Sequence, residues 1–417
     1  MKNIQKHIEL SILYFGYILF IFSIKFNAIS NVASYTGNIL FISACLIFVL
    51  IREDVYKIVA SIYVWLIFLF CVLFFGFGSF FGLSPYGIIF YLKVIVLIVF
   101  FYNSKIKLLD FIGFLNNTYL IYLFLSLLVY FNIIPQLVEK DNLNIFIESY
   151  FGLTFTTMYG IEGSTASIDS YSALVLVINL FLNTNKKRFI FVFLSLFIAL
   201  WTTRMTPIVS VIVIIIAYIF TFNRKLALML IIFPMIIFII VIYLLVYQSI
   251  YVSYEGASIP FVDALAFSTH SRAYFWQSQL TYLLNDYSIK DYIFGRFDEG
   301  FDFDLIIGNR VKNNNPHNSY LYLFYRSPLL FLIFYNLFLT YFYKNYRKAF
   351  VPPIFFILLS SFTNVSILGI YNPSYLLVIV FLLVEGAKNK NDEFSANSSS
   401  PSVNINEPII SINRQSE

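Results

Sequence analysis

The sequence predicts an all-α polytopic integral membrane protein with about twelve transmembrane helices. Three observations predict this fold class: 60% of the 417 residues are hydrophobic, only 12% are charged, and the mean hydropathy is +0.81. Such a chain has far more apolar surface than one soluble core could bury. The same composition excludes a soluble globular enzyme and a disordered chain. A lipid bilayer is the solvent that suits it.

Apolar runs of membrane-spanning length recur along the chain. A transmembrane helix needs about 20 apolar residues, and fewer where interfacial aromatic residues anchor its ends. The first run is longer than the apolar core of a secretory signal peptide and has no small-residue cleavage site, so we expect a membrane anchor. The predicted spans are 8–25, 34–51, 58–77, 85–102, 111–131, 171–184, 189–203, 207–222, 226–247, 326–343, 349–364 and 374–386.

Basic residues alternate with these spans. Seventeen Lys and Arg residues fall at the termini and in alternate connections, nine fall on the other side, and Lys93 lies within a span. By the positive-inside rule the richer side, with both termini, is cytoplasmic. We expect Lys93 to face the bundle interior or a polar cavity, because a charge facing lipid is costly. The basic residues form short clusters rather than one stripe, which argues against a nucleic-acid partner.

The predicted organisation is one transmembrane domain, 1–386, followed by a disordered cytoplasmic tail, 387–417, that is rich in Lys, Asn and Ser. Two long extracytoplasmic connections interrupt the domain, at 132–170 and 248–325. Within the second, residues 272–287 place their apolar side chains near one helical face, which predicts an interfacial amphipathic helix.

Arg204 lies in a tight predicted hairpin between two spans, in the sequence Trp201-Thr-Thr-Arg-Met-Thr-Pro207. Thr206 suits an N-cap and Pro207 suits the first helical turn. An arginine beside the unpaired amides of a helix N-terminus forms a good anion site. The alternative is an interfacial arginine that reaches lipid phosphate.

His317 lies where the second long connection returns to the membrane, in the sequence Asn313-Asn-Asn-Pro-His-Asn-Ser-Tyr320. Asn318 or Ser319 can cap the helix that follows, which places the imidazole beside the positive end of a helix dipole. That position disfavours the imidazolium and leaves a neutral base near pH 7. The alternative is a polar turn residue without a chemical role.

Arg272 opens the predicted amphipathic helix, four residues before Trp276, and its charge would lie near a lipid headgroup. The alternative is a solvated arginine at a helix end. Arg310 ranks lower by the same reasoning. Acidic candidates for contacts with sugar hydroxyls, which otherwise serve solubility, are Glu162, Asp169 and Glu255.

We expect chemistry without a metal or a cofactor. The two cysteines, Cys45 and Cys71, lie within apolar runs, and the chain has no His-rich tract and no Cys pair with ligand spacing. It also has no Gly-rich phosphate loop. Extracytoplasmic chemistry without nucleotide hydrolysis needs a substrate that already carries a good leaving group.

The order of these features resembles the O-antigen polymerase (Wzy) family and the related O-antigen ligase (WaaL) family, over roughly residues 190–345. The chain departs from the family pattern at Arg326-Ser-Pro328, where the family commonly has a glycine a few residues after the His-Asn pair. The residues that carry the resemblance are Thr203-Arg204, Ser271-Arg272 with Trp276, the Ile-Phe-Gly of 293–295, and Pro316-His317-Asn318-Ser-Tyr-Leu.

The resemblance implies a GT-C-like, lipid-carrier-dependent glycosyltransferase of the bacterial inner membrane, inverting and metal-independent. Donor and acceptor would both be glycans on undecaprenyl pyrophosphate, and the family adds a chain-length regulator as an expected partner. Arg204 and Arg272 would stabilise the departing pyrophosphate, and His317 would accept the proton of the acceptor hydroxyl. The implied substrate-binding residues are Asn318, Trp276, Arg310 and Glu255.

Three alternatives stay open at this point. A ligase would use the same chemistry and transfer finished polymer to a lipid acceptor. A repeat-unit flippase or another secondary transporter also has about twelve spans, but such proteins usually show internal repeats and charges within their spans. A structural membrane subunit would leave the charges of the long connections without a role.

Overall fold

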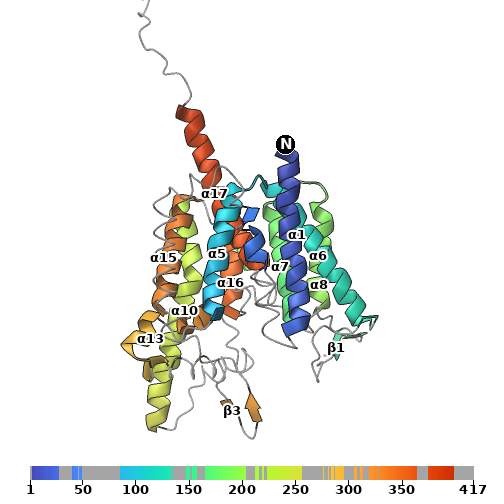
Figure 1. Ribbon diagram of the computed structural model, residues 1–417. Coiled ribbons are helices and arrows are strands. Elements are labelled where there is room, and N and C mark those ends of the chain that lie inside the picture. The colour runs from blue at the N-terminus through green and yellow to red at the C-terminus, as the bar shows by residue number, and fades with distance from the viewer. Residues whose placement is uncertain are drawn as a thin grey trace, which may run out of the picture.

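The chain folds into a bundle of helices, with two small β-hairpins beyond one end (Figure 1). The structure, a computed structural model, describes residues 2–27, 40–45, 47–48, 85–131, 133–134, 147–150, 153–156, 165–202, 212–215, 218–219, 223–255, 276, 280, 283–285, 287–294, 305–307, 310–312, 319–326, 328–363 and 374–398.

The main helices run along the bundle. They are α1 (Lys2–Asn27), α5 (Pro85–Asn103), α6 (Leu108–Tyr130), α7 (Thr165–Phe181), α8 (Arg188–Trp201), α10 (Arg224–Glu255), α15 (Pro328–Lys344), α16 (Val351–Thr363) and α17 (Ser374–Ser398). Shorter elements are α13 (Ile289–Phe294), α14 (Ser319–Arg326) and the 3-10 turn η1 (Lys348–Phe350). The hairpins pair β1 (Ile147–Tyr150) with β2 (Leu153–Thr156) and β3 (Leu305–Ile307) with β4 (Arg310–Lys312), both antiparallel.

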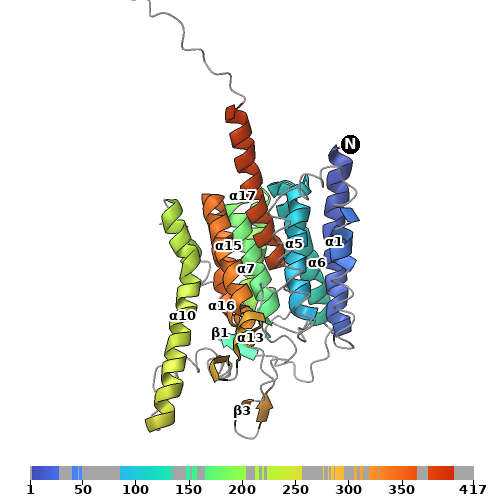
Figure 2. The ribbon, with the colours of Figure 1, turned by 60° about the vertical axis from the view of Figure 1, so that its left-hand side comes forward.

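Helix α7 lies at the centre of the bundle and packs against α6, α8 and α16. Every residue from Tyr171 to Asn179 is buried, so no side of this segment is exposed to the surroundings. Helix α17 packs against α5 and α16, and α10 packs at the edge against α15 and α16 (Figure 2). Helix α16 in turn joins α7 to α10, α14 and α17.

Helices α8 and α10 expose large apolar side chains. A wide apolar face that no protein contact covers is typical of a helix that faces lipid or a partner. The exposed residues include Phe189, Ile190, Phe193 and Phe197 on α8, and Met229, Phe233, Ile236, Ile239 and Ile240 on α10. Within the described part of the chain, two helical stretches are long and apolar enough to cross a membrane, Leu108–Tyr130 and Arg224–Val241.

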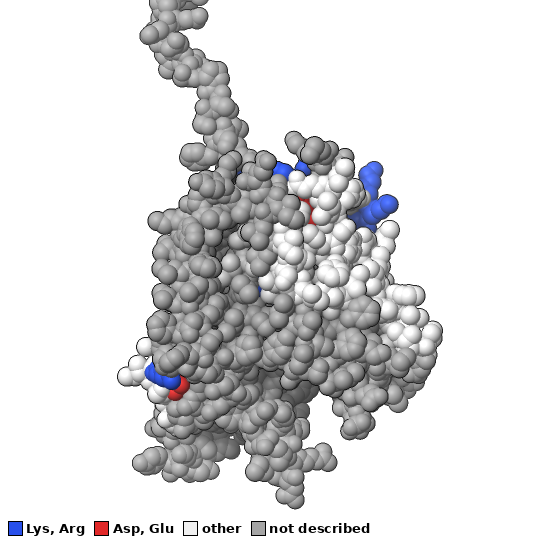
Figure 3. All heavy atoms as spheres, in the orientation of Figure 1, with Lys and Arg blue, Asp and Glu red and all other residues white. Residues whose placement is uncertain are grey.

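The chain start, the end of α17 and several basic connections meet at one end of the bundle, called the basic end here. Lys6 pairs with Asp110 at 3.0 Å, and Lys388 Nζ donates to the carbonyl of Ser104 at 2.8 Å. Further along this end, the guanidinium of Arg224 lies 3.8 Å from the ring centre of Tyr343. Figure 3 shows Lys and Arg side chains at this end of the molecule. The alternate basic connections that the sequence predicts to share a side therefore lie together at one end of the bundle.

The opposite end, called the loop end here, collects the other helix termini. The rings of Tyr130 and Trp201, at the ends of α6 and α8, are 5.6 Å apart. The hydroxyl of Tyr375, at the start of α17, donates to the carbonyl of Ser170 near the start of α7 at 2.6 Å. Both hairpins lie beyond this end (Figures 1 and 2). The helix ends that border the two long connections therefore lie at the end opposite the basic connections.

The predicted helix boundaries hold best for α5 and α6, which cover the predicted spans 85–102 and 111–131 almost residue for residue. The predicted span 326–343 corresponds to α15, which begins at Pro328 and ends at Lys344. Helix α14 ends at Arg326, and residue 327 lies outside the described residues. Helix α10 continues to Glu255, past the predicted end of its span at residue 247.

Two further predictions need correction. The all-α fold class is right for the bundle but misses the hairpins; Gly308-Asn309 separates β3 from β4 and is a typical two-residue turn sequence. The tail was predicted to be disordered from residue 387, but α17 stays helical to Ser398. Lys, Glu and Ala tolerate a helix well, so a polar composition alone does not end one. Residues 399–417 lie outside the described part of the chain.

We predict that Glu9 stabilises the basic end more than the Lys6–Asp110 pair does. Glu9 is fully buried and its carboxylate accepts from the backbone N–H of Lys105 at 2.7 Å and from Gln5 Nε2 at 2.6 Å. Glu9→Ala leaves these donors without their acceptor, which costs about 1–3 kcal/mol. Lys6→Ala removes a half-exposed ion pair that contributes at most about 1 kcal/mol.

The measurement is the Tm of the detergent-solubilised full chain. A lower Tm for Glu9→Ala than for Lys6→Ala is expected. The reverse order would show that the surface pair, rather than the buried acceptor, holds α1 in place.

Candidate functional site

The sequence-predicted site residues belong to connections at the loop end. Arg204, Arg272, His317 and Asn318 lie outside the described residues. The backbone of Arg310 begins β4. Glu255 is the last residue of α10, at the same end of the bundle in Figures 1 and 2. The structure therefore shows where these connections leave the bundle.

Trp276 has a different setting from the one expected of a sugar-stacking residue. Its side chain is only 3% exposed and belongs to the main apolar core together with Leu280. Leu283, a further turn along, is also buried, whereas Leu284 is 53% exposed. Trp276, Leu280 and Leu283 are therefore turned into the protein rather than toward a lipid surface. We assign the indole a packing role that anchors this connection.

Asp169 is a buried carboxylic acid at the loop end. It lies in the second turn of α7 and is 3% exposed. Its Oδ1 accepts a hydrogen bond of 3.0 Å from Thr202 Oγ1, at the end of α8. Thr202 is itself 1% exposed and also lies 2.9 Å from the carbonyl of Ala199. This contact joins α7 to α8 at the point where the chain continues toward Arg204.

Residues 169–172 form a polar layer, called the α7 belt here, in which each residue bonds to another helix. Beyond the Asp169 bond to α8 and the Ser170 bond to α17, the hydroxyls of Tyr171 and Thr118 share a hydrogen bond of 2.8 Å. The hydroxyls of Ser172 and Tyr119 share another of 2.8 Å. These last two bonds reach α6. The belt thus ties three helices to α7 in one turn.

Hydrogen bonding explains why an apolar bundle tolerates this layer. A buried polar group without a partner costs several kcal/mol. Rotation or sliding of α7 against its neighbours would break all four bonds together. The α7 belt therefore sets the register of α6, α7, α8 and α17 at the loop end.

A second polar cluster joins α6 to α7 nearer the basic end. Asn116 and Asn179 exchange reciprocal side-chain hydrogen bonds of 3.1 and 2.8 Å. Asn183 Nδ2 donates to Asn179 Oδ1 at 2.7 Å, and all three amides are buried. The cluster has no charge and its amides are paired with one another. We interpret it as a structural pin between the two helices.

Lys93 is buried in α5 with 5% of its surface exposed. Its ammonium lies close enough to Cys45 for an electrostatic interaction. The prediction that Lys93 faces the bundle interior is confirmed. The sequence signal was its position, since a lysine in an apolar span is rarely turned toward lipid.

Helix α13 lies at the loop end and packs on α15. Asp291 Oδ2 accepts from the backbone N–H of Ser288 at 2.8 Å and from its hydroxyl at 2.7 Å, which caps the start of the helix. The hydroxyl of Tyr292 donates to the carbonyl of Leu283 at 2.7 Å, and burial raises the pKa of this hydroxyl above its ordinary value. Ile289, 80% exposed, is left as an apolar side chain on the surface.

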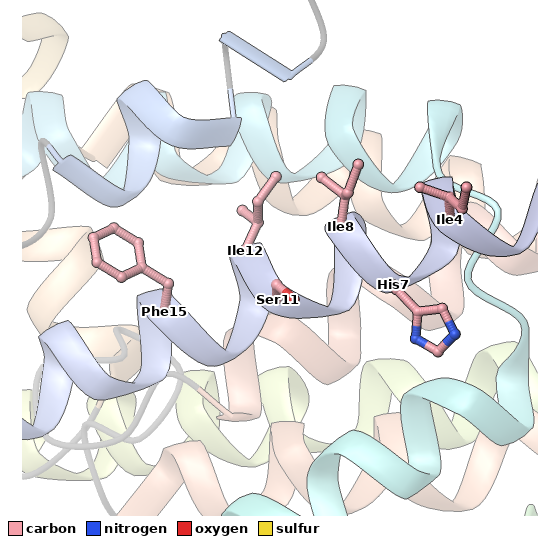
Figure 4. A pocket seen from close by; sticks show the side chains of 6 residues that line it. All are labelled: Ile4, His7, Ile8, Ser11, Ile12 and Phe15. Atoms are coloured by element: carbon pink, nitrogen blue, oxygen red, sulfur yellow. The ribbon is translucent and has the colours of Figure 1, made fainter. Parts of the chain in front are cut away.

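A shallow groove of about 510 Å³ runs along α1, away from the loop end (Figure 4). It is lined by side chains of one helix, and His7 is its ionisable residue. No residue of the α7 belt contributes to it. The groove-lining residues are Ile4, His7, Ile8, Ser11, Ile12 and Phe15.

A metal centre is absent from the described part of the chain, where no group of three His, Cys, Asp or Glu residues could hold an ion. The sequence also contains an Asp-x-Asp pair, Asp302-Phe-Asp304, outside the described residues. Carboxylates at this spacing can share a divalent cation. Metal independence therefore stays a prediction that needs a chelation experiment.

No protein-family model, curated protein or solved structure matches this chain. The sequence indicated Asp169 as a candidate for contacts with sugar hydroxyls that otherwise serves solubility, and it did not single out Thr202, Tyr119 or Tyr171. These last three residues fall within predicted spans, where each buried polar group must find a partner, and this was the signal that could have found them.

Proposed function

We propose that this protein is a membrane-embedded polysaccharide polymerase. It would join oligosaccharide repeat units carried on undecaprenyl pyrophosphate, at the outer face of a bacterial inner membrane, to make O-antigen or a related surface polysaccharide. The observation that supports this proposal best is the separation of the two bundle ends. The basic connections meet at one end, and the helix termini that lead to Arg204 and to both long connections meet at the other.

The membrane setting is supported by the exposed apolar surface. The outward faces of α8 and α10 carry large apolar residues along their length, including Phe193 and Ile239. Exposure of these faces to water is unfavourable in free energy, whereas contact with lipid tails carries no such penalty. The proposal includes the other predicted transmembrane helices of the twelve-span architecture.

The proposed reaction is an inverting glycosyl transfer. The acceptor hydroxyl attacks the anomeric carbon of the donor sugar, the bond from that carbon to the pyrophosphate oxygen breaks, and the lipid pyrophosphate leaves. Arg204 and Arg272 would receive its developing negative charge through charge-assisted hydrogen bonds. His317 would take the proton of the acceptor hydroxyl. Arginine stays protonated, so its role is electrostatic.

The test is reconstitution of the full chain in liposomes with synthetic lipid-linked repeat units, followed by sizing of the products. We expect chains of several repeat units and no loss of product in EDTA. Transport of labelled units without chain growth would favour the flippase. Transfer of preformed polymer to a lipid acceptor, without growth from single units, would favour the ligase. Product that disappears in EDTA and returns with Mg²⁺ would contradict metal independence.

The predicted topology can be tested in cells. A cysteine introduced within residues 399–417 should be protected from a membrane-impermeant maleimide, because the basic end faces the cytoplasm. A cysteine within residues 256–270 should be labelled from outside. Both experiments need a background without Cys45 and Cys71. Labelling of the tail but not of the long connection would reverse the orientation and remove the proposed function.

A further inference from the structure

We propose that Asp169 and Thr202 form a positioning contact for glycosyl transfer, beyond the arginines and the histidine considered above. The inference rests on the proposed function, because it concerns the geometry of the same site. The contact is the hydrogen bond of 3.0 Å from Thr202 Oγ1 to Asp169 Oδ1, and both side chains are almost completely buried.

The contact lies where the chain leaves the bundle toward Arg204. Thr202 follows the last residue of α8, and Arg204 comes two residues later in the sequence. On the other side of α8, Trp201 packs edge-on against Tyr130 of α6 with 5.6 Å between ring centres. The end of α8 is therefore held from two directions, by a ring contact to α6 and by a carboxylate of α7.

Asp169 is the carboxylic acid among the residues of the α7 belt. The other residues of the α7 belt, Ser170 to Ser172, join their helices through uncharged hydroxyl and carbonyl groups. A buried carboxylate costs far more desolvation than an amide of the same shape. A fixed negative charge at this end is useful if guanidinium groups must be held in one orientation, since a carboxylate is their strongest protein partner.

Neither side chain is proposed to touch the reacting atoms, so Asp169 and Thr202 are positioning residues rather than catalytic ones. A loss of the contact should leave substrate binding nearly intact and slow the chemical step. A misplacement of about 1 Å at a distance from the reacting atoms can cost a factor of about 100 in rate. We therefore expect a change in kcat rather than in KM.

The experiment compares Thr202→Val with Thr118→Val in the reconstituted full chain. Both changes replace a buried threonine by its isostere and remove one hydrogen bond to α7, to Asp169 and to Tyr171 respectively. Thr202→Val should lower kcat by about 10- to 100-fold with little change in KM. Thr118→Val should keep the wild-type kcat, although its Tm should fall by about as much as that of Thr202→Val. Thr202→Ser restores the hydroxyl and should restore kcat.

Asp169→Asn gives a second, independent test, because it keeps the acceptor oxygen for Thr202 and removes the charge. It should lower kcat at an unchanged Tm. Equal kcat values for Thr202→Val and Thr118→Val, or a wild-type kcat in Asp169→Asn, would overturn the inference while the proposed function stands. If the wild-type chain makes no product in the same assay, the proposed function itself fails.

Discussion

His317→Ala abolishes polymer formation while the protein still accumulates in the membrane: this is the largest effect that we expect. Removal of a general base lowers the rate by about 100- to 10,000-fold, which takes polymer below detection in cells. Arg272→Ala should have the same result, because it removes a charge that stabilises the leaving pyrophosphate. Arg204→Lys should also fail, since lysine keeps the charge but loses the planar fork. The measurement is the length distribution of lipid-attached glycan on gels, at equal protein level.

His7 provides the control for this series. It is exposed on α1 at the basic end, so His7→Ala should leave the glycan pattern unchanged. In a deletion strain a polymerase defect leaves single repeat units on the lipid acceptor, whereas a ligase defect leaves none. Normal polymer in all three site variants would remove the site assignment.

Asn179→Leu should cause the largest loss of stability that we expect from a single uncharged side chain. The amide of Asn179 bonds to both Asn116 and Asn183 in the buried interface of α6 and α7. Leucine fills a similar volume but leaves two buried amides without these partners, which costs roughly 2 kcal/mol. The measurement is a fall of several degrees in the Tm of the full chain in detergent.

Asn336→Leu is the matched control. Its side chain is exposed on α15 and bonds only to the backbone of its own helix, at 2.8 Å from the carbonyl of Leu332. Its Tm should be close to that of the wild type. The double variant Asn116→Leu with Asn179→Leu should lose less than the sum of the two single changes, since no amide of that pair is then left alone. Additive losses would show that the reciprocal bonds do not stabilise the bundle.

Much of the fold could be predicted because the preference of each segment for water or for an apolar environment depends on its local composition. Apolar runs predicted α5 and α6 almost to the residue, and the basic connections predicted which helix ends would meet. The boundaries were poorest where a local rule opposed the pattern. Helix-compatible residues carry α17 beyond its apolar part, to Ser398.

The candidate site stays a prediction for Arg204, Arg272 and His317, which lie outside the described residues. These residues came from sequence context, because a charge next to an apolar run is costly and therefore informative. The partners of Asp169 could not be predicted, since Thr202 is 33 residues away in the chain and no local pattern pairs the two. Trp276 shows the opposite case, in which a residue typical of a binding surface is buried as an anchor.

The sequence by itself determined that the chain is helical and apolar, and which of its connections share a side, because both properties are sums over local composition. Only the tertiary structure decided which polar groups meet inside the bundle, including the Asp169–Thr202 contact and the Asn116–Asn179 pair. The physical reason is that a buried hydrogen bond needs two groups within about 3 Å in a particular direction. The packing of helices far apart in sequence sets that distance.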